Sequence, residues 1–369
     1  MKLARSVRSR LSLSLFSPRS VSPSLSQAPS LSRAFPRSFS QPRRRAARLA
    51  VAMAGVCLMS SALWPAPVRA ADDYPSRPIK FIVPFPPGSA TDTSARYFGK
   101  KLTEMTGQPV VIENRAGGNG FIAVQQVLSA PPDGYTIFIG SNSTLSTNAA
   151  LFKKLPYDPV NDFVPITGLM RGPALLIAPP DSPYKTLAEF VDAARKAPGK
   201  LSYGGGSAGY QLMGEHFAEA TGTKLLYVPY KGASDAVTAV AASSVDFSPV
   251  DASAALELAR NGKVRALAIA ADKRAPALPD VPTVMEAGVK GFTAYVWVAA
   301  VAPARTPQPI VDKLTKLFVE IVALPETQAF YQRSGGEASP PGPEFFRKFQ
   351  QDEIALWKRI VAVAKVEQQ

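Results

Sequence analysis

The sequence predicts an α/β protein built from two lobes. Short apolar strands alternate with helical segments along residues 79–140, and a second set of the same kind follows along residues 175–269. Strands separated by helices of this length form βαβ units and a largely parallel sheet. An apolar segment at 296–301 then crosses back, and three helices, at 308–323, 325–334 and 343–364, end the chain.

The first set opens with a buried strand at 79–84 and a helix at 92–106. One face of that helix carries Ala95, Phe98, Leu102 and Met105, which is the spacing of an amphipathic helix. A strand at 110–113, a loop at 114–119, a helix at 120–130 and a strand at 135–140 complete the set. The second set has two helices and five strands: a strand at 175–178, helices at 186–196 and 210–221, and strands at 201–203, 225–228, 245–247 and 264–269.

The charge of the chain is concentrated in its first 70 residues. The chain has a formal charge of +14, and residues 1–70 carry twelve of the 42 Lys and Arg residues but none of the 28 Asp and Glu residues. The rest therefore carries 30 basic and 28 acidic residues. A near-neutral body has no electrostatic footprint for phosphate backbones, so we expect no nucleic-acid partner.

The basic stretch ends in the pattern of a secretory signal peptide. A basic n-region at 43–48 precedes an apolar h-region at about 49–64, and Val68 and Ala70 are the small residues of a cleavage site near Ala70/Ala71. The apolar run is shorter than the roughly 20 residues that a membrane anchor requires. We therefore expect residues 1–70 to be a leader and the mature protein to be periplasmic.

Other interpretations of the leader stay open. Residues 1–42 share the Ser- and Arg-rich, acid-free composition of organellar transit peptides, although a translation start placed too early is favoured. Arg43 and Arg44 also allow a twin-arginine signal, with little support from their neighbours. Val56 before Cys57 does not favour a lipoprotein site.

Cysteine and histidine usage excludes several kinds of chemistry. Cys57 is the only cysteine and lies in the h-region, and His216 is the only histidine. The mature chain therefore has no disulfide, thiolate metal site, cysteine nucleophile or His-rich metal site. We expect no metal and no cofactor.

Two loops after strands have the composition of ligand-binding loops. Residues 84–92 (PFPPGSATD) join the first strand to the first helix, where backbone N–H groups favour an anion. Residues 141–148 (SNSTLSTN) carry a hydroxyl or an amide at every position except Leu145. Helix capping by Ser89 or Thr91, and ordinary turn chemistry in the second loop, explain the same residues without a ligand.

A third loop, residues 204–209 (GGGSAG), contains the G-x-S-x-G pattern of a serine hydrolase between a strand and a helix. The only histidine, His216, is nine residues further on, whereas the hydrolase order places an acid and then the histidine far downstream. A glycine-rich backbone that binds an anion is the better interpretation. A dinucleotide pattern at Gly118, Gly120 and Ala123 lacks the acidic residue expected after the next strand.

At the level of short motifs, the mature chain resembles the substrate-binding proteins of tripartite tricarboxylate transporters, also called the Bug family. The matching segments run in family order over residues 72–369. They are 74–79 (YPSRPI), 83–88 (VPFPPG) followed by Thr91 and Asp92, 107–115 (GQPVVIENR), 132–135 (PDGY), 155–159 (LPYDP), 198–200 (PGK), 228–232 (VPYKG), 262–267 (GKVRAL) and 274–283 (RAPALPDVPT).

The resemblance implies a type II Venus-flytrap fold in which each lobe is a doubly wound sheet flanked by helices. Lobe 1 would comprise residues 72–171 and 295–369, and lobe 2 residues 172–294. A small carboxylate would bind between the lobes through amides, hydroxyls and waters rather than arginine. The implied ligand contacts are Phe85, Gly88, Ser89, Ala90, Thr91, Asp92, Asn142, Ser143, Thr144, Ser207, Ala208, Gly209 and Asp251.

Several residues depart from the family pattern. The first loop has Gly88-Ser89-Ala90 where two small residues, often glycines, are usual, and Gln211 stands where many members have histidine. The loop at 204–209 is about two residues shorter than usual, and the segment ending at Asp251 differs from the common acidic-Asn arrangement. These departures leave the identity of the ligand open.

We therefore expect a monomeric extracytoplasmic binding protein that delivers a carboxylate to the membrane components of a tripartite transporter. The alternative is a sensor that presents its bound form to a signalling partner. We do not expect an enzyme, since no base, nucleophile or metal constellation is evident.

Overall fold

The computed structural model describes residues 74–333 and 335–369 of the protein. The predicted leader (1–70), its h-region (49–64) and the cleavage site lie outside the described residues. Within them, β1 (Ile79–Val83) lies between β2 (Val110–Asn114) and β3 (Thr136–Ser141), and both pairings are parallel. This unit matches the first predicted set of strands.

The helices of the first set follow from local signals. In α2 (Ala90–Thr106), Ser89 is the N-cap and Gly107, with a φ of 71°, ends the helix in a left-handed conformation. Three of the four predicted apolar residues are buried, whereas Met105 in the last turn is exposed. A short turn, η3 (Gly118–Gly120), precedes α3 (Phe121–Leu128).

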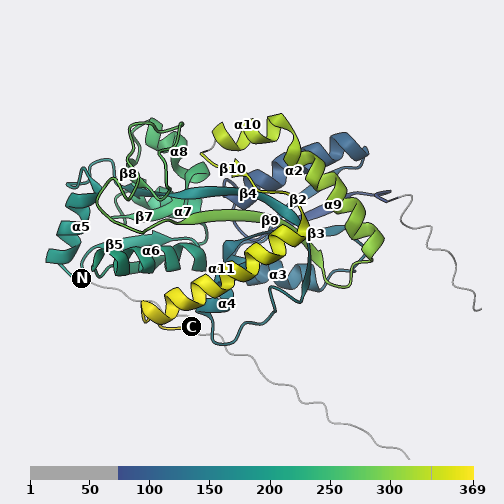
Figure 1. Ribbon diagram of the computed structural model, residues 1–369, viewed down its shortest axis with the longest axis horizontal. Coiled ribbons are helices and arrows are strands. Elements are labelled where there is room, and N and C mark those ends of the chain that lie inside the picture. The colour runs from purple at the N-terminus through teal and green to yellow at the C-terminus, as the bar shows by residue number, and fades with distance from the viewer. Residues whose placement is uncertain (1–73, 334) are drawn as a thin grey trace, which may run out of the picture. The chain divides into compact units, whose positions relative to one another are not determined.

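Two long strands connect the two predicted sets (Figure 1). β4 (Phe163–Ala178) extends twelve residues further towards the N-terminus than the predicted strand at 175–178, and β9 (Tyr295–Pro303) runs antiparallel to both β4 and β3. The expectation of a largely parallel sheet was therefore wrong for the strands that pair with β4 and β9. The predicted lobe boundary at 171/172 falls inside β4.

The last residues of β4 belong to a second group of strands. β7 (Ser248–Asp251) and β8 (Arg265–Ile269) pair antiparallel with residues 174–178 of β4. A parallel pair, β5 (Ser202–Gly205) and β6 (Leu226–Pro229), joins this group through a Tyr203–Phe247 bridge. The predicted strand at 245–247 lies just before β7. Figure 1 shows the helices of this group near β5, β7 and β8: α5 (Leu187–Lys196), α6 (Ala208–Thr221), α7 (Ala233–Ala241) and α8 (Ala252–Arg260).

The C-terminal segment returns to the first group. α9 (Gln308–Ala323), α10 (Pro325–Arg333) and α11 (Pro343–Val363) match the three predicted helices, and β10 (Glu337–Ala338) pairs with β4. Phe318 of α9 packs on Phe81 and Phe98, with ring centroids 5.8 and 5.6 Å apart. This contact fixes α9 against β1 and α2.

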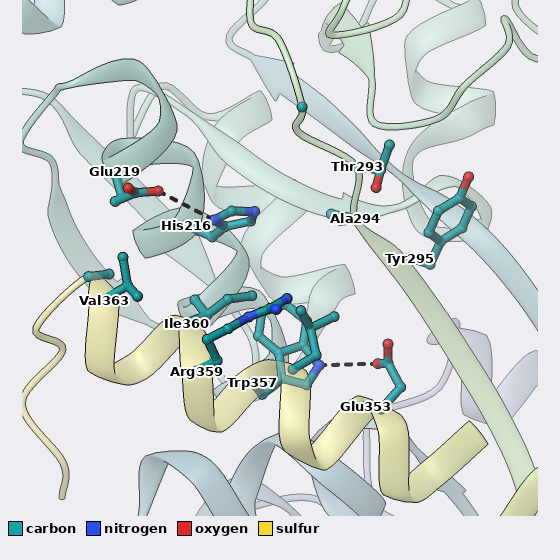
Figure 2. Close-up of a pocket in the computed structure, with 13 residues that line it drawn as sticks. His216, Glu219, Thr293, Ala294, Tyr295, Glu353, Trp357, Arg359, Ile360 and Val363 are labelled. Atoms are coloured by element: carbon teal, nitrogen blue, oxygen red, sulfur yellow. Dashed lines mark hydrogen bonds and ion pairs between the residues drawn. The ribbon is translucent and has the colours of Figure 1, made fainter. Parts of the chain in front are cut away.

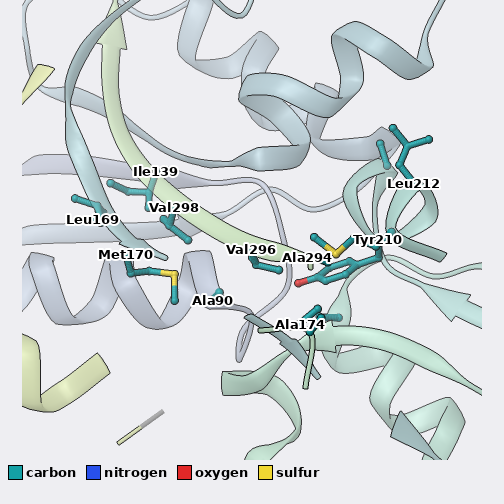
Figure 3. Packing of buried hydrophobic residues seen from close by; sticks show 14 of the residues in the cluster. Ala90, Ile139, Leu169, Met170, Ala174, Tyr210, Leu212, Ala294, Val296 and Val298 are labelled. Atoms are coloured by element: carbon teal, nitrogen blue, oxygen red, sulfur yellow. The ribbon is translucent and has the colours of Figure 1, made fainter. Parts of the chain in front are cut away.

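Stacked aromatic rings also lie in the core of the second group. Phe247 stacks with Phe190 at 4.7 Å and with Phe217 at 5.1 Å. Figure 3 shows how the core continues along β4 and β9, from Ile139 and Val298 to Tyr210 of α6. No helix in the described ranges is both long and apolar enough to cross a membrane.

Candidate functional site

A small cavity lies where the segments after β1, β3 and β5 meet. Its volume is about 20 Å³, and none of its lining residues is charged. A single water needs about 10–15 Å³, so this cavity is too small for a dicarboxylate. The lining residues are Phe85, Ser89, Ala90, Thr91, Ser141, Asn142, Ser143, Ser207, Tyr210, Ala233 and Val296.

Ser89 and Thr91 present hydroxyls from the start of α2. Ser89 Oγ accepts a hydrogen bond from Asp92 N at 3.3 Å and lies 3.0 Å from Thr91 Oγ1. The N–H groups of the first helical turn have no partner inside the helix. Ala90 and Thr91 belong to that turn and line the cavity together with Ser89.

Asp92 holds the loop in place through hydrogen bonds and does not line the cavity. Its carboxylate accepts hydrogen bonds from Gly88 N at 3.0 Å, Arg96 Nε at 3.0 Å and Asn114 Nδ2 at 2.9 Å. Burial by itself raises the pKa of Asp92, but the bonds from Arg96, Gly88 and Asn114 outweigh that effect and the pKa is lowered. The charge of Asp92 is therefore already compensated by Arg96 of the same helix.

The predicted polar loop at 141–148 is helical. A π-helical turn, η4 (Ser143–Thr147), leads into α4 (Asn148–Leu151). Asn142 and Ser143 stand at its start and line the cavity, whereas the Thr144 hydroxyl turns back to β3 by donating to Ser141 O at 3.3 Å. Thr144 therefore shapes the turn and does not reach the cavity.

The third loop contacts η4 directly. Ser143 Oγ donates a hydrogen bond to Ser207 Oγ at 2.8 Å and accepts one from Gly209 N at 3.2 Å. A Cβ at Gly209 would lie 2.7 Å from both Asn142 Nδ2 and Ser143 Oγ. A glycine is thus required here for close approach of the two segments.

The first loop also contacts the start of α7. Ser234 Oγ donates to Pro87 O at 3.3 Å, and a Cβ at Gly232 would lie 2.5 Å from Pro86 Cδ. Ala233, the first residue of α7, lines the cavity. The N-termini of α2, α6 and α7 therefore converge on one small space whose lining is uncharged, an arrangement that favours a bound anion.

Comparison with known proteins identifies the family of this chain. The family described as "Tripartite tricarboxylate transporter family receptor" matches residues 94–366. The chain belongs to this family. Its members are substrate-binding proteins rather than enzymes, and they function in the periplasm.

Individual relatives agree with the family assignment. Protein BugT of Bordetella pertussis is 34% identical over 80% of this chain and 91% of its own length. An R. palustris protein solved with adipate is 33% identical with a TM-score of 0.77, covering 79% of this chain and 99% of that one. MatC of Rhodopseudomonas palustris with bound malate is 33% identical with a TM-score of 0.74, covering 78% and 100%.

Seven of the thirteen residues expected to contact ligand in this receptor line the cavity. The other six do not line it; they are Gly88, Asp92, Thr144, Ala208, Gly209 and Asp251. Four lining residues were not expected: Ser141, Tyr210, Ala233 and Val296. Ser141 lies in the loop that the sequence singled out, and Tyr210 directly follows the third loop, so adjacency to these loops was the only available signal. The seven expected residues that line the cavity are Phe85, Ser89, Ala90, Thr91, Asn142, Ser143 and Ser207.

Asp251 lies behind the cavity, where it holds Tyr210. Asp251 caps α8 by accepting from Ala254 N at 3.0 Å, and it accepts from the Tyr210 hydroxyl at 2.6 Å. Burial, followed by the nearby Asp251 carboxylate, raises the pKa of Tyr210 well above its ordinary value. Tyr210 is therefore a neutral phenol whose orientation is fixed.

A larger groove, about 480 Å³ in volume, lies between α6 and α11. Figure 2 shows His216 and Glu219 of α6 facing Trp357 of α11 across it, with residues 293–295 along a third side. His216 Nδ1 lies 3.8 Å from Glu219 Oε2, and burial lowers the pKa of the imidazole despite that neighbour. The His216 imidazole therefore lies beside Glu219 in this groove, whereas the Ser207 hydroxyl accepts a hydrogen bond from Ser143 at the small cavity.

Proposed function

We propose that this receptor captures a small carboxylate between two lobes and delivers it to the membrane components of a tripartite tricarboxylate-type transporter. Family membership supports the transporter partner. Relatives that match over nearly their whole length and were solved with adipate and with malate support a carboxylate ligand.

The observation that carries the proposal is the convergence of three helix N-termini on one uncharged cavity. Each N-terminus carries a partial positive charge of about half a unit. Ser89 and Thr91 add hydroxyls at α2 and Ser207 adds one at α6, whereas the Ser143 hydroxyl donates to Ser207 and is released only when that contact opens. Groups of this kind would bind a carboxylate without an arginine, which is the mode of binding that the family resemblance implies.

The contacts between segments support a mechanism of closure. Lobe 1 (72–171 and 295–369) supplies Ser143 and Pro87, and lobe 2 (172–294) supplies Ser207 and Ser234, which meet them within hydrogen-bond distance. A cavity of about 20 Å³ admits no dicarboxylate, so ligand enters only after these contacts separate. Each lobe would then contribute part of the site, which makes the closed form the better binder.

The proposal includes an exported, monomeric protein. The leader (1–70) would direct export and would be removed near Ala70/Ala71. Two lobes that together enclose one site need no second copy of the chain. The mature N-terminus is checked by mass spectrometry of exported protein, and the monomer by its mass in solution.

A panel of mono-, di- and tricarboxylates in a thermal-shift screen tests the function. A ligand that binds only the folded state raises the melting temperature by mass action. We expect at least one carboxylate to do so and to give a saturable calorimetric isotherm. A response to sugars or cations, with none to carboxylates, would contradict the proposal.

A variant that fills the cavity tests whether the ligand binds there. Ser207→Trp inserts a side chain larger than the cavity itself, and we expect binding to be lost while the melting temperature without ligand is retained. Ser244→Trp is the matched control, because Ser244 is exposed on the same lobe and does not line the cavity. Equal affinity in both variants would place the ligand elsewhere.

A further inference from the structure

The backbone of η4 differs from the α-helix that follows it. Asn148 N donates a hydrogen bond to Ser143 O, five residues back, whereas an α-helix would pair it with Thr144 O, four residues back. A five-residue bond is that of a π-helix, which is rare and occurs mostly as single turns. Two carbonyls in this turn accept hydrogen bonds from side chains outside it, those of Thr144 and Leu145.

Tyr157 bonds the first of these carbonyls. Its hydroxyl donates to Thr144 O at 2.6 Å and accepts from Asn148 Nδ2 at 2.9 Å. The side chain is buried, and burial raises the pKa of the phenol, so Tyr157 keeps the proton that it donates. The carbonyl that Asn148 N would bond in an α-helix is thus bonded by Tyr157.

Gln350 of α11 bonds the second carbonyl. Its Nε2 donates to Leu145 O and to Pro159 O, both at 2.8 Å, and its Oε1 accepts from Arg347 Nη1 at 2.9 Å. The bond from Arg347 fixes which end of the amide faces the turn, because guanidinium only donates. Gln350 is 1% exposed. Both of its amide hydrogens are therefore used to join η4 to the segment at 155–159.

The π-turn sets the direction in which Ser143 points. Buried Ala150 and Leu151 anchor α4 in the core. With α4 held there, a change of η4 to the α-helical bond pattern would rotate Ser143 by about one residue, roughly 100° around the helix axis. Ser143 Oγ would then leave Ser207 Oγ, now at 2.8 Å, and Gly209 N, now at 3.2 Å.

We propose that Tyr157 and Gln350 are positioning residues for ligand capture, which hold η4 as a π-turn and so aim the Ser143 hydroxyl at α6. Neither residue lines the cavity, whereas Ser143 does. The inference rests on the proposed function, since closure around a ligand uses the bonds of Ser143. It also gives the segment at 155–159 a role at the site.

The conformation of η4 tests the inference without a ligand. Tyr157→Phe removes the donor to Thr144 O, and Gln350→Met removes both amide bonds at nearly equal side-chain length. In crystal structures of the two variants, we expect the α-helical bond pattern in η4 and Ser143 Oγ beyond hydrogen-bond distance of α6. Tyr157→Phe is the milder change, so the test stands if Gln350→Met prevents folding.

Tyr74→Phe is the matched control. The Tyr74 hydroxyl is also buried and donates to a backbone carbonyl, Gly134 O, at 2.7 Å, but it does not contact η4. We expect this variant to retain the π-turn and the wild-type affinity.

Ligand affinity tests whether the two side chains act through Ser143. The probe is the member of a panel of acetate, succinate, malate, adipate and citrate that most raises the melting temperature of the wild type. In calorimetry, we expect Tyr157→Phe and Gln350→Met each to weaken binding about tenfold, as Ser143→Ala does. Combined with Ser143→Ala, each should cost less than about twofold more, because side chains that act through one hydroxyl are not additive.

The outcomes separate this inference from the function on which it rests. A variant that keeps the π-turn and both Ser143 bonds removes its residue from the proposal. Retention in both variants, or losses of affinity that multiply in the combined variants, overturns the inference and leaves carboxylate capture intact. A folded wild type that no member of the panel stabilises contradicts the proposed function instead, and the crystal structures still decide whether the two side chains hold η4.

Discussion

Replacing Gly209 by alanine tests closure, because Gly209 lies at the contact between α6 and η4. Its added methyl carbon would lie 2.7 Å from Asn142 Nδ2 and Ser143 Oγ, well inside the roughly 3.5 Å optimum of non-bonded carbon contacts. Both neighbours are short and buried, at 3% and 2% exposure, so neither side chain can swing away. The two segments must separate instead.

The cost follows from the hydrogen bonds that this separation breaks. Ser143 Oγ would lose its bonds to Gly209 N and to Ser207 Oγ. Each contributes about 0.5–1.5 kcal/mol net, so closure becomes about 1–3 kcal/mol less favourable. That change weakens ligand binding by about 5- to 150-fold. Alanine is favoured over glycine within a helix by about 0.5–1 kcal/mol, so each lobe keeps its stability.

Calorimetry measures the affinity, and small-angle scattering with saturating ligand measures the closure. Gln211→Ala is the control on the same helix, because the Gln211 side chain accepts a hydrogen bond from the exposed Gln369 and does not line the cavity. Wild-type affinity together with full compaction in Gly209→Ala would refute the reasoning, since the contact would then not limit closure.

Three further predictions concern single side chains. Ser143→Ala removes the hydroxyl that joins η4 to α6 and should weaken binding about tenfold in calorimetry. Ser146→Ala is the control and should leave the affinity unchanged, because the Ser146 hydroxyl has no hydrogen-bond partner among the described residues. Equal losses of affinity in the two variants would exclude a specific role for the Ser143 hydroxyl. Neighbouring arginine and glutamine side chains lower the pKa of Glu113 to about 2, so its charge stabilises the fold above the ordinary value of 4.5, and that contribution is lost as the pH falls towards 2. Glu113→Gln should therefore lower stability at neutral pH by less than about 1 kcal/mol, and melting curves that show a constant difference down to pH 2 would contradict this. Phe247→Ala should cost about 3–5 kcal/mol in denaturant unfolding and the exposed Phe345→Ala only about 0.5 kcal/mol; similar losses would mean that Phe247 is not central to its core.

Much of the fold was predictable because its signals are local. Ser89 and Gly107 bound α2 by capping, and the apolar spacing between them predicted its buried face. The first half of β4 was not predictable, because Pro165 and Pro173 interrupt its pattern. The structure accommodates Pro165 at a shift in register between β4 and β9. α7 was also missed, since its alanine-rich sequence has a weak apolar period.

The candidate site was predictable as a set of loops but not as a set of contacts. Residues 84–92, 141–148 and 204–209 follow strands and are polar or rich in glycine, and each contributes residues to the lining of the cavity, whereas their contact with a ligand stays a prediction. The sequence also suggested Asp92 and Asp251 as ligand contacts. In the structure Asp92 is engaged by Arg96 and Asp251 by Tyr210, so whether either touches ligand stays a prediction.

The sequence by itself determined the family, the α/β class, the positions of most helices and strands, and an uncharged, hydroxyl-rich set of loops. Caps, apolar periods and turns act between residues a few positions apart, so a linear pattern contains them. Only the tertiary structure decided the antiparallel return of β9 and which hydroxyls face one another. Ser143 and Ser207 are 64 positions apart in the chain, and the packing of whole elements brings them to 2.8 Å. The same packing brought the Tyr210 hydroxyl to 2.6 Å from Asp251, 41 positions further along the chain.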